Sequence, residues 1–184
     1  MYHFTKYCKP AVLAEGWKDD KRPSKDEYYL EFAKAAAIRG TCLRRNYGAV
    51  IVNNDEIVAT GFNGPARNEP HCETCTKKQG NGDMDEYCSC PAIHAEMNAI
   101  ISAARRDMAG ADIYLAGFDV RTNAEHKEAW PCEICLRLIK NSGINRIINR
   151  TGVIYQRDEK TGILDRWYFR TLIDKMEYLD QKGN

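Results

Sequence analysis

Residues 90–100 read Cys-Pro-Ala-Ile-His-Ala-Glu-Met-Asn-Ala-Ile, and residues 131–135 read Pro-Cys-Glu-Ile-Cys. These two segments supply one histidine, His94, and a pair of cysteines, Cys132 and Cys135. Imidazole nitrogen and thiolate sulfur are both ligands that zinc prefers in proteins. A zinc ion held by three protein groups keeps a fourth position open to water, which is typical of catalytic rather than structural sites. The two segments therefore predict a three-ligand zinc site.

Both segments lie at the beginnings of helices that the sequence predicts, over Ala92–Met108 and Cys132–Asn141. Two cysteines three residues apart lie on the same face of a helix, and the N-terminal end of a helix lowers the pKa of a thiol. If the two helices pack beside each other, the histidine completes the ligand set. Glu96 stands outside that set but within reach of the water, so it is predicted to act first as a general base and then as a general acid. A redox C-x-x-C pair is the alternative, and it leaves the histidine and Glu96 without a role.

The remaining sequence alternates predicted helices and strands around these segments. Ser24 and Glu27 form the pattern of a capping box at the start of a helix. The polar residues 53–55 are typical of a hairpin turn between two apolar strands. The order of helix, two strands, helix, strand, helix and strand predicts an α/β fold. The other predicted elements are a helix over Lys25–Ile38, strands over Ala49–Val52, Glu56–Thr60, Asp112–Ala116 and Ile144–Ile148, and a helical C-terminal tail at about 165–180.

Size and charge limit the class of protein. The chain has 184 residues, of which 43% are hydrophobic, and this suits a single domain over residues 1–184. The formal net charge of +1 argues against a polynucleotide partner, whereas a small anionic substrate needs only a few local cations. The sequence shows no signal peptide and no apolar run of membrane-spanning length, so we expect a cytoplasmic protein with no membrane partner.

Eight cysteines are many for a chain of this length. Four of them fall in two closely spaced pairs within a polar insert at about residues 66–91: Cys72 and Cys75, then Cys88 and Cys90. Four thiolates would close a tetrahedral structural zinc site and order a segment that has little else to fold it. His71 and Cys42 are rival ligands, and reduced thiols without a metal are the alternative. We therefore expect two zinc ions per chain, one catalytic and one structural.

The quoted residues also carry a resemblance to a known family. Residues 90–100 and 131–135 resemble the core of the cytidine and deoxycytidylate deaminase superfamily, in which H-x-E is followed by P-C-x-x-C. Gly48–Val52 and Gly61–Gly64 are similar to its deoxycytidylate (dCMP) deaminase branch. The resemblance covers about residues 25–150. It implies a three-layer α/β/α sandwich of the cytidine deaminase type, in which a central mixed sheet carries helices on both faces.

The resemblance implies an activity: hydrolytic deamination of dCMP to dUMP and ammonia, which supplies dUMP for thymidylate synthesis. Glu96 would pass a proton from the water to the ring nitrogen and later protonate the departing ammonia. The resemblance places Asn63 in contact with the substrate, although a turn residue beside Gly64 is the alternative. It places Ala95 in the wall of the base pocket. The substrate is then a small-molecule nucleotide, and a homo-oligomer is expected because the family is usually oligomeric.

The sequence departs from the family pattern just before its second segment. Residues 119–129 intervene there, and Trp130 precedes the proline. Trp130 would either stack on the base or close the insert against the core, and Tyr155 would either stack on the base or pack in the interior. Four arginines near the hairpin are candidates for the phosphate: Arg39, Arg44, Arg45 and Arg67.

Competing functions are kept beside the leading one. Within the class, the substrate could be another base or nucleoside, namely cytidine, guanine, a tRNA adenosine or a base in single-stranded DNA. From another class, the chain could be a zinc-binding module without catalysis. Glu96 argues against that module, because a purely structural zinc site has no use for its carboxylate.

Overall fold

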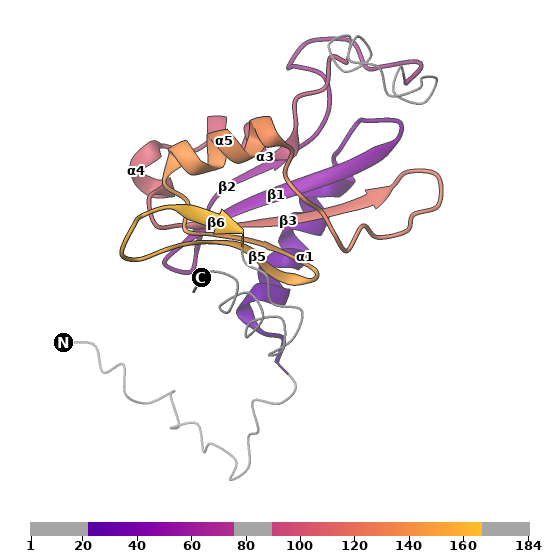
Figure 1. Ribbon diagram of the computed structural model, residues 1–184. Coiled ribbons are helices and arrows are strands. Elements are labelled where there is room, and N and C mark those ends of the chain that lie inside the picture. The colour runs from indigo at the N-terminus through magenta and orange to yellow at the C-terminus, as the bar shows by residue number, and fades with distance from the viewer. Residues whose placement is uncertain (1–21, 76–89, 167–184) are drawn as a thin grey trace, which may run out of the picture.

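The computed structural model describes residues 22–75 and 90–166, and these residues form one mixed sheet with helices on both faces (Figure 1). The sheet order is β2-β1-β3-β4-β5-β6. β3 and β4 are parallel, and every other neighbouring pair is antiparallel. The strands are β1 (Arg45–Asn53), β2 (Glu56–Phe62), β3 (Asp112–Asp119), β4 (Arg146–Asn149), β5 (Gly152–Arg157) and β6 (Leu164–Arg166).

One face of the sheet is covered by α1 (Lys25–Ile38). The predicted capping box is present, because the Ser24 side chain accepts from the backbone of Glu27 while the Glu27 carboxylate accepts from the backbone of Ser24. Successive strand residues point to opposite faces of a sheet, so every second residue of β1 and β3 packs under this helix. The buried cluster on this face comprises Tyr29, Leu30, Ala33, Val50, Val52, Tyr114, Ala116 and Ile148.

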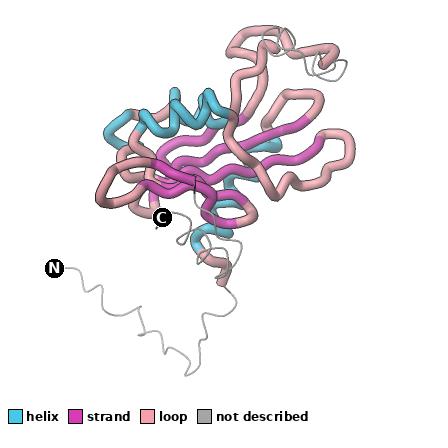
Figure 2. The backbone as a smooth tube through the Cα atoms, viewed as in Figure 1, coloured by secondary structure: helices cyan, strands magenta, loops and turns pink. Residues whose placement is uncertain are grey.

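The opposite face carries α3 (Ala95–Ile101), α4 (Arg105–Met108) and α5 (Glu133–Ser142). α3 and α5 lie beside each other over the sheet, away from α1 (Figures 1 and 2). The alternate residues of the same strands, such as Ile51 and Ile113, are fully buried beneath them. The three-layer α/β/α prediction is therefore confirmed.

Two strand glycines let the helices approach the sheet closely. A Cβ atom at Gly48 would clash with the α1 backbone at Ala33 and Ala37, and a Cβ atom at Gly61 would clash with the α3 backbone at Ala95 and Ala99. Any larger side chain would push the helix away from its face. The glycines thus set the distance of each helix layer from the sheet.

Several predicted boundaries are wrong. The single helix predicted over Ala92–Met108 is two helices, α3 and α4, because Ile93 pairs with Gly64 as an isolated β-bridge and residues 102–104 are not helical. The strand predicted over Asp112–Ala116 continues to Asp119, where it pairs with Arg45.

At the C-terminal end, the sequence prediction missed two strands, β5 and β6, and Tyr155 lies inside β5 rather than after the last strand. The tail predicted to be helical from Asp165 begins instead with β6, and its other residues lie outside the described part of the chain. Among the described residues, no helix has both the length and the apolar character required to cross a membrane.

Candidate active site

The first residues of two helices meet at the site. His94 is the N-cap residue of α3, and Cys132 is the N-cap residue of α5. The Nδ1 atom of His94 lies 3.4 Å from the Sγ atom of Cys132 and 3.3 Å from the Sγ atom of Cys135. Packing of α3 against α5 therefore brings together side chains that are about forty residues apart in the sequence.

The three side chains have the chemistry and spacing of a zinc-binding set. Their ligand atoms all lie within 4.8 Å of one another, and in the part of the chain that the structure describes no other group of three such residues does so. Zinc–sulfur and zinc–nitrogen bonds at a tetrahedral angle separate the sulfur and nitrogen atoms by about 3.6 Å. The two observed sulfur–nitrogen distances are close to that value, so the residues fit the metal.

Glu96 lies beside these ligands in the first turn of α3 and is only 7% exposed. Burial raises the pKa of its carboxyl, because the ionised form loses its hydration, and hydrogen bonds from the backbone and from Cys135 partly oppose the shift. Burial also raises the pKa of the Cys135 thiol. A bound divalent cation reverses the shift at the thiol, since it favours the thiolate.

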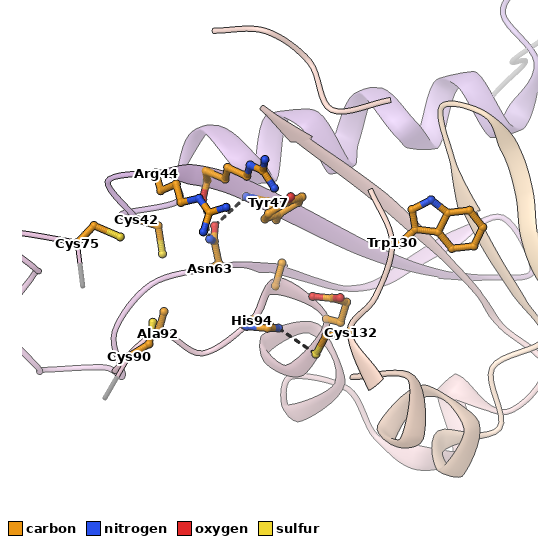
Figure 3. Close-up of a pocket in the computed structure, with 13 residues that line it drawn as sticks. Cys42, Arg44, Tyr47, Asn63, Cys75, Cys90, Ala92, His94, Trp130 and Cys132 are labelled. Carbon is orange, nitrogen blue, oxygen red and sulfur yellow. Dashed lines mark hydrogen bonds between the residues drawn. The ribbon is translucent and has the colours of Figure 1, made fainter. Parts of the chain in front are cut away.

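A cavity of about 320 Å³ extends from His94, Glu96 and Cys132 to the start of β1 and the end of β2. Its lining includes His94, Ala95, Glu96 and Cys132, together with Asn63 at the end of β2. In Figure 3, Cys42, Cys75 and Cys90 lie toward one end of the cavity and Trp130 toward the other. The structure thus places Asn63 and Ala95 in the wall of the same cavity as Glu96 and two of the three predicted zinc ligands, His94 and Cys132.

Asn63 is buried and holds the start of β1 in place. Its Oδ1 atom accepts from the backbone N–H of Tyr47 at 2.8 Å, and its Nδ2 atom donates to the carbonyl of Arg45 at 2.8 Å. A primary amide can make further bonds, because its oxygen has a second lone pair and its nitrogen a second hydrogen. Asn63 therefore holds the start of β1, and its contact with the substrate stays a prediction.

The segment before α3 is fixed by a two-way backbone bridge. Ile93 donates to the carbonyl of Gly64 at 2.8 Å, and Gly64 donates to the carbonyl of Ile93 at 3.2 Å. One bridge therefore positions the residue that precedes His94 and the residue that follows Asn63.

Trp130 forms part of the cavity wall and is 37% exposed. The ring of Tyr155 meets it edge to face at a centroid distance of 6.1 Å, and the Arg166 guanidinium lies 4.4 Å from its centroid. Tyr155 packs against the buried core. The structure favours packing for Tyr155, whereas the position of Trp130 in the cavity wall leaves both of its alternatives as predictions.

The second predicted metal group is described only in part, because Cys88 lies outside the described residues. Cys75 and Cys90 line the cavity together with Cys42, the rival ligand, whereas Cys72 does not. Among these described cysteines, no three have sulfur atoms within 4.8 Å of one another.

Two of the four candidate arginines line the cavity, namely Arg44 and Arg45. Arg39 lies instead over the ring of Phe62 at 6.0 Å, and Arg67 is not part of the lining. The sequence interpretation missed Tyr47 and Ala92 as lining residues. The one sequence signal for Tyr47 as a lining residue was the alternation of side chains between the two faces along β1. The position of Ala92 depends on the backbone bridge at the next residue, Ile93, and no sequence signal indicated that bridge.

Comparisons with known proteins agree with this geometry. Residues 23–151 match the family described as "Cytidine and deoxycytidylate deaminase zinc-binding region". The chain is 36% identical to the deoxycytidylate deaminase of Mycobacterium phage D29, over 69% of this chain and 94% of that protein. It is 32% identical to the deoxycytidylate deaminase of Schizosaccharomyces pombe, over 78% of this chain but only 41% of the relative, so it spans about two fifths of that protein.

Among solved structures, the chain is similar to the dCMP deaminase from the cyanophage S-TIM5 in complex with dCMP and dUMP. The TM-score is 0.51 at 23% identity, with 69% of this chain and 81% of that chain covered. At this identity, the similarity supports the fold alone.

Proposed function

Because the chain belongs to the cytidine and deoxycytidylate deaminase family, we propose that it catalyses the zinc-dependent hydrolytic deamination of dCMP to dUMP and ammonia. The observation that carries the proposal is the cavity lined by His94, Cys132 and the buried Glu96, with Cys135 completing the cluster of ligand atoms beside it. The relatives named deoxycytidylate deaminase support dCMP as the substrate.

His94, Cys132 and Cys135 would hold the catalytic zinc. When bound, zinc supplies positive charge that makes a water molecule acidic enough to act as a nucleophile near neutral pH. Glu96 removes a proton from the water that attacks C4 of the cytosine ring and delivers it to ring nitrogen N3. It then takes the remaining proton from the hydroxyl on C4 and delivers it to the leaving amine, so that a C4=O bond replaces the C4–N bond and ammonia departs. The raised pKa of Glu96 suits this work, because a carboxyl that titrates nearer neutrality both accepts and returns a proton.

The other cavity residues orient the substrate. Ala95 is buried to 1% exposure and presents a small wall against which a flat base fits. Two hydrogen bonds hold Asn63 to β1, and its second amide hydrogen would donate to the nucleotide. Trp130 would provide an aromatic wall at the other end of the cavity.

We further propose a second, structural zinc ion held by cysteines of the insert at about 66–91. Cys75 and Cys90 are two of the four predicted ligands, Cys72 and Cys88 being the others. Cys42 lines the cavity together with Cys75 and Cys90, and this position supports Cys42 as an alternative ligand. Metal analysis of the purified protein should give two zinc ions per chain, and one ion in the Cys90→Ser variant. One ion in both proteins would contradict the second site.

We also propose that the protein acts in the cytoplasm as a homo-oligomer. The exposed apolar residues Ile101 of α3 and Ile134 of α5 support self-association, because their helices lie beside each other on one face. Light scattering during size-exclusion chromatography would determine the mass. A monomer at micromolar concentration would contradict this part of the proposal.

The activity is tested by following absorbance during incubation with dCMP, cytidine, dCTP and guanine. We expect dCMP to be turned over fastest. The Glu96→Gln variant should lose about 10³-fold in kcat while it retains the catalytic zinc, because general acid–base catalysis contributes about 10²–10⁴-fold. Glu69→Gln is the matched control, since Glu69 is exposed and lies outside the cavity lining. Turnover of cytidine without turnover of dCMP would contradict the proposal.

A further inference from the structure

The indole of Trp130 in the cavity wall contacts two residues of the C-terminal strands. Tyr155 of β5 and Arg166 of β6 stand directly opposite each other in the antiparallel β5–β6 pair, so their side chains leave the same face of the sheet. The Tyr155 ring meets the indole edge to face, with an interplanar angle of 78°. The Arg166 guanidinium lies over the indole, where the negative charge of the ring face attracts a cation. One cross-strand pair therefore holds the indole of Trp130.

The backbone next to Trp130 is fixed from β4. Asn149, the last residue of that strand, is 1% exposed, and its Nδ2 atom donates to the carbonyl of Ala129 at 3.4 Å. Its Oδ1 atom accepts from the backbone N–H of Thr151 at 2.8 Å and from the hydroxyl of Thr151 at 2.6 Å. These hydrogen bonds compensate the buried amide for its lost hydration. The Asn149 side chain thus links the turn after β4 to the residue before Trp130.

This support acts close to the proposed zinc ligands. Trp130 is followed by Pro131 and by Cys132, the N-cap residue of α5, so the Cα atoms of Trp130 and Cys132 are at most about 7 Å apart. Figure 3 shows the indole at the end of the cavity away from Cys42 and Cys90. The Trp130 side chain is only partly covered by β5 and β6, so part of it is accessible from the cavity. A pyrimidine whose C4 atom reaches the ligand atoms therefore comes within reach of the indole.

The contacts that hold the indole come from a part of the chain that the family match does not include. Tyr155 and Arg166 both lie beyond residues 23–151, which match the deaminase family. Arg166 is the last residue of β6, which has three residues and is the last strand of the described sheet. This short strand therefore has a specific contact with the wall of the active-site cavity.

We propose that Trp130 packs against the pyrimidine base and that Arg166 is a positioning residue, which acts through Trp130 together with Tyr155 and Asn149. The inference rests on the proposed function, because it concerns substrate binding in the same cavity. An indole wall binds the base alike in the ground state and in the transition state, so it contributes to affinity rather than to the rate of the chemical step. The strands β5 and β6 then determine how tightly the chain binds its nucleotide.

A double-mutant cycle on the zinc-loaded protein tests this coupling. Isothermal titration with dUMP should show about 10- to 100-fold weaker binding for Trp130→Ala, in line with the loss of aromatic stacking on a base. Arg166→Gln should weaken binding about 3- to 30-fold in the wild-type background and less than about twofold in the Trp130→Ala background, because the guanidinium then has no indole to hold. Arg166→Lys, which keeps a cation, should recover part of the affinity. Lys160→Gln is the matched control, since Lys160 is exposed in the same β5–β6 hairpin and lies outside the cavity lining.

Fluorine NMR of protein labelled with 5-fluorotryptophan follows the indole without any ligand. The chain has three tryptophans, and the Trp130→Phe variant identifies the Trp130 resonance by its absence. Arg166→Gln should shift or broaden that resonance, whereas Lys160→Gln should leave it unchanged.

Three results would overturn the inference: a Trp130 resonance that Arg166→Gln does not change, a Trp130→Ala variant that binds dUMP as tightly as the wild-type protein, or an equal effect of Arg166→Gln on dUMP affinity in both backgrounds. Failure of the proposed function appears differently, as absence of dCMP turnover by a wild-type protein whose Trp130 resonance still depends on Arg166.

Discussion

The close approach of α3 to β2 predicts that a single methyl group added at Gly61 will impair the active site by displacing α3. In Gly61→Ala, the added Cβ would clash with the backbone of α3 at Ala95 and Ala99. Ordinary contact at 3.4 Å or more requires α3 to move away from the sheet by about 1 Å. The helix carries Glu96 and begins at His94, so these two residues move relative to the cysteines of α5.

A shift of this size exceeds what the site tolerates. Zinc ligands hold their distances within about 0.2 Å, and a displacement of about 1 Å at a catalytic group costs about 100-fold in rate. We expect Gly61→Ala to lose at least about 100-fold in kcat/KM for dCMP and to release zinc more readily to a colorimetric chelator. Overpacking should cost about 1–3 kcal/mol of stability, which lowers the melting temperature by about 3–10 °C.

Gly48→Ala is the matched control on the other face of the sheet. Its Cβ would clash with the backbone of α1, which carries none of the proposed ligands. This variant should lose similar stability while it keeps zinc and most of its activity. If both variants lost activity equally, or if Gly61→Ala kept full zinc content and rate, the argument from helix position would be refuted.

Two further predictions concern the metal and the pH dependence of stability. Removal of zinc with a chelator should lower the melting temperature by about 8 °C or more and abolish dCMP turnover. The reason is that a ligand present at about 1,000 times its dissociation constant stabilises the folded state by about 4 kcal/mol. Added zinc should restore the melting temperature and the turnover, and a melting temperature unchanged by the chelator would contradict the prediction. Hydrogen bonds from the backbone and side chain of Ser24 hold the pKa of Glu27 below its usual value. The capping box therefore stabilises the folded state at pH values above the pKa of Glu27 in the unfolded chain, about 4.5. This contribution is lost as the pH falls through the lower pKa of Glu27 in the folded protein. Urea unfolding between pH 7 and pH 3 should therefore show a smaller acid-induced loss in Glu27→Gln than in the wild-type protein, and equal losses would contradict the assignment.

Much of the central fold could be predicted from the sequence because local signals agree with tertiary packing there. Ser24 and Glu27 fix the start of α1 through their own side chains. Asn54 and Asp55 both adopt positive φ angles at the tip of the β1–β2 hairpin, a conformation that these residue types tolerate better than most. Gly143 ends α5 in the left-handed region, as its position after Asn141 and Ser142 predicts.

The errors arise where distant segments decide the local structure. Ile93 has an apolar side chain at helical spacing, but its backbone pairs with Gly64 instead of continuing α3 toward the N-terminus. β6 has three residues and depends on pairing with β5, so its own sequence carries little information. The presence of both Arg44 and Arg45 in the cavity lining requires the bend at Arg44, which no local pattern predicts.

The backbone bridge between Gly64 and Ile93 makes the relative positions of Asn63 and His94 independent of the number of residues between them. The two ends of that long connection are tied together at hydrogen-bonding distance, so a longer or shorter connection leaves the anchor points unchanged. Each doubling of a flexible loop adds only about 0.6 kcal/mol of closure entropy. The bridge would therefore keep His94 in register with Asn63 when the length of this connection changes, provided that its cavity-lining residues Cys75, Cys90 and Ala92 are kept.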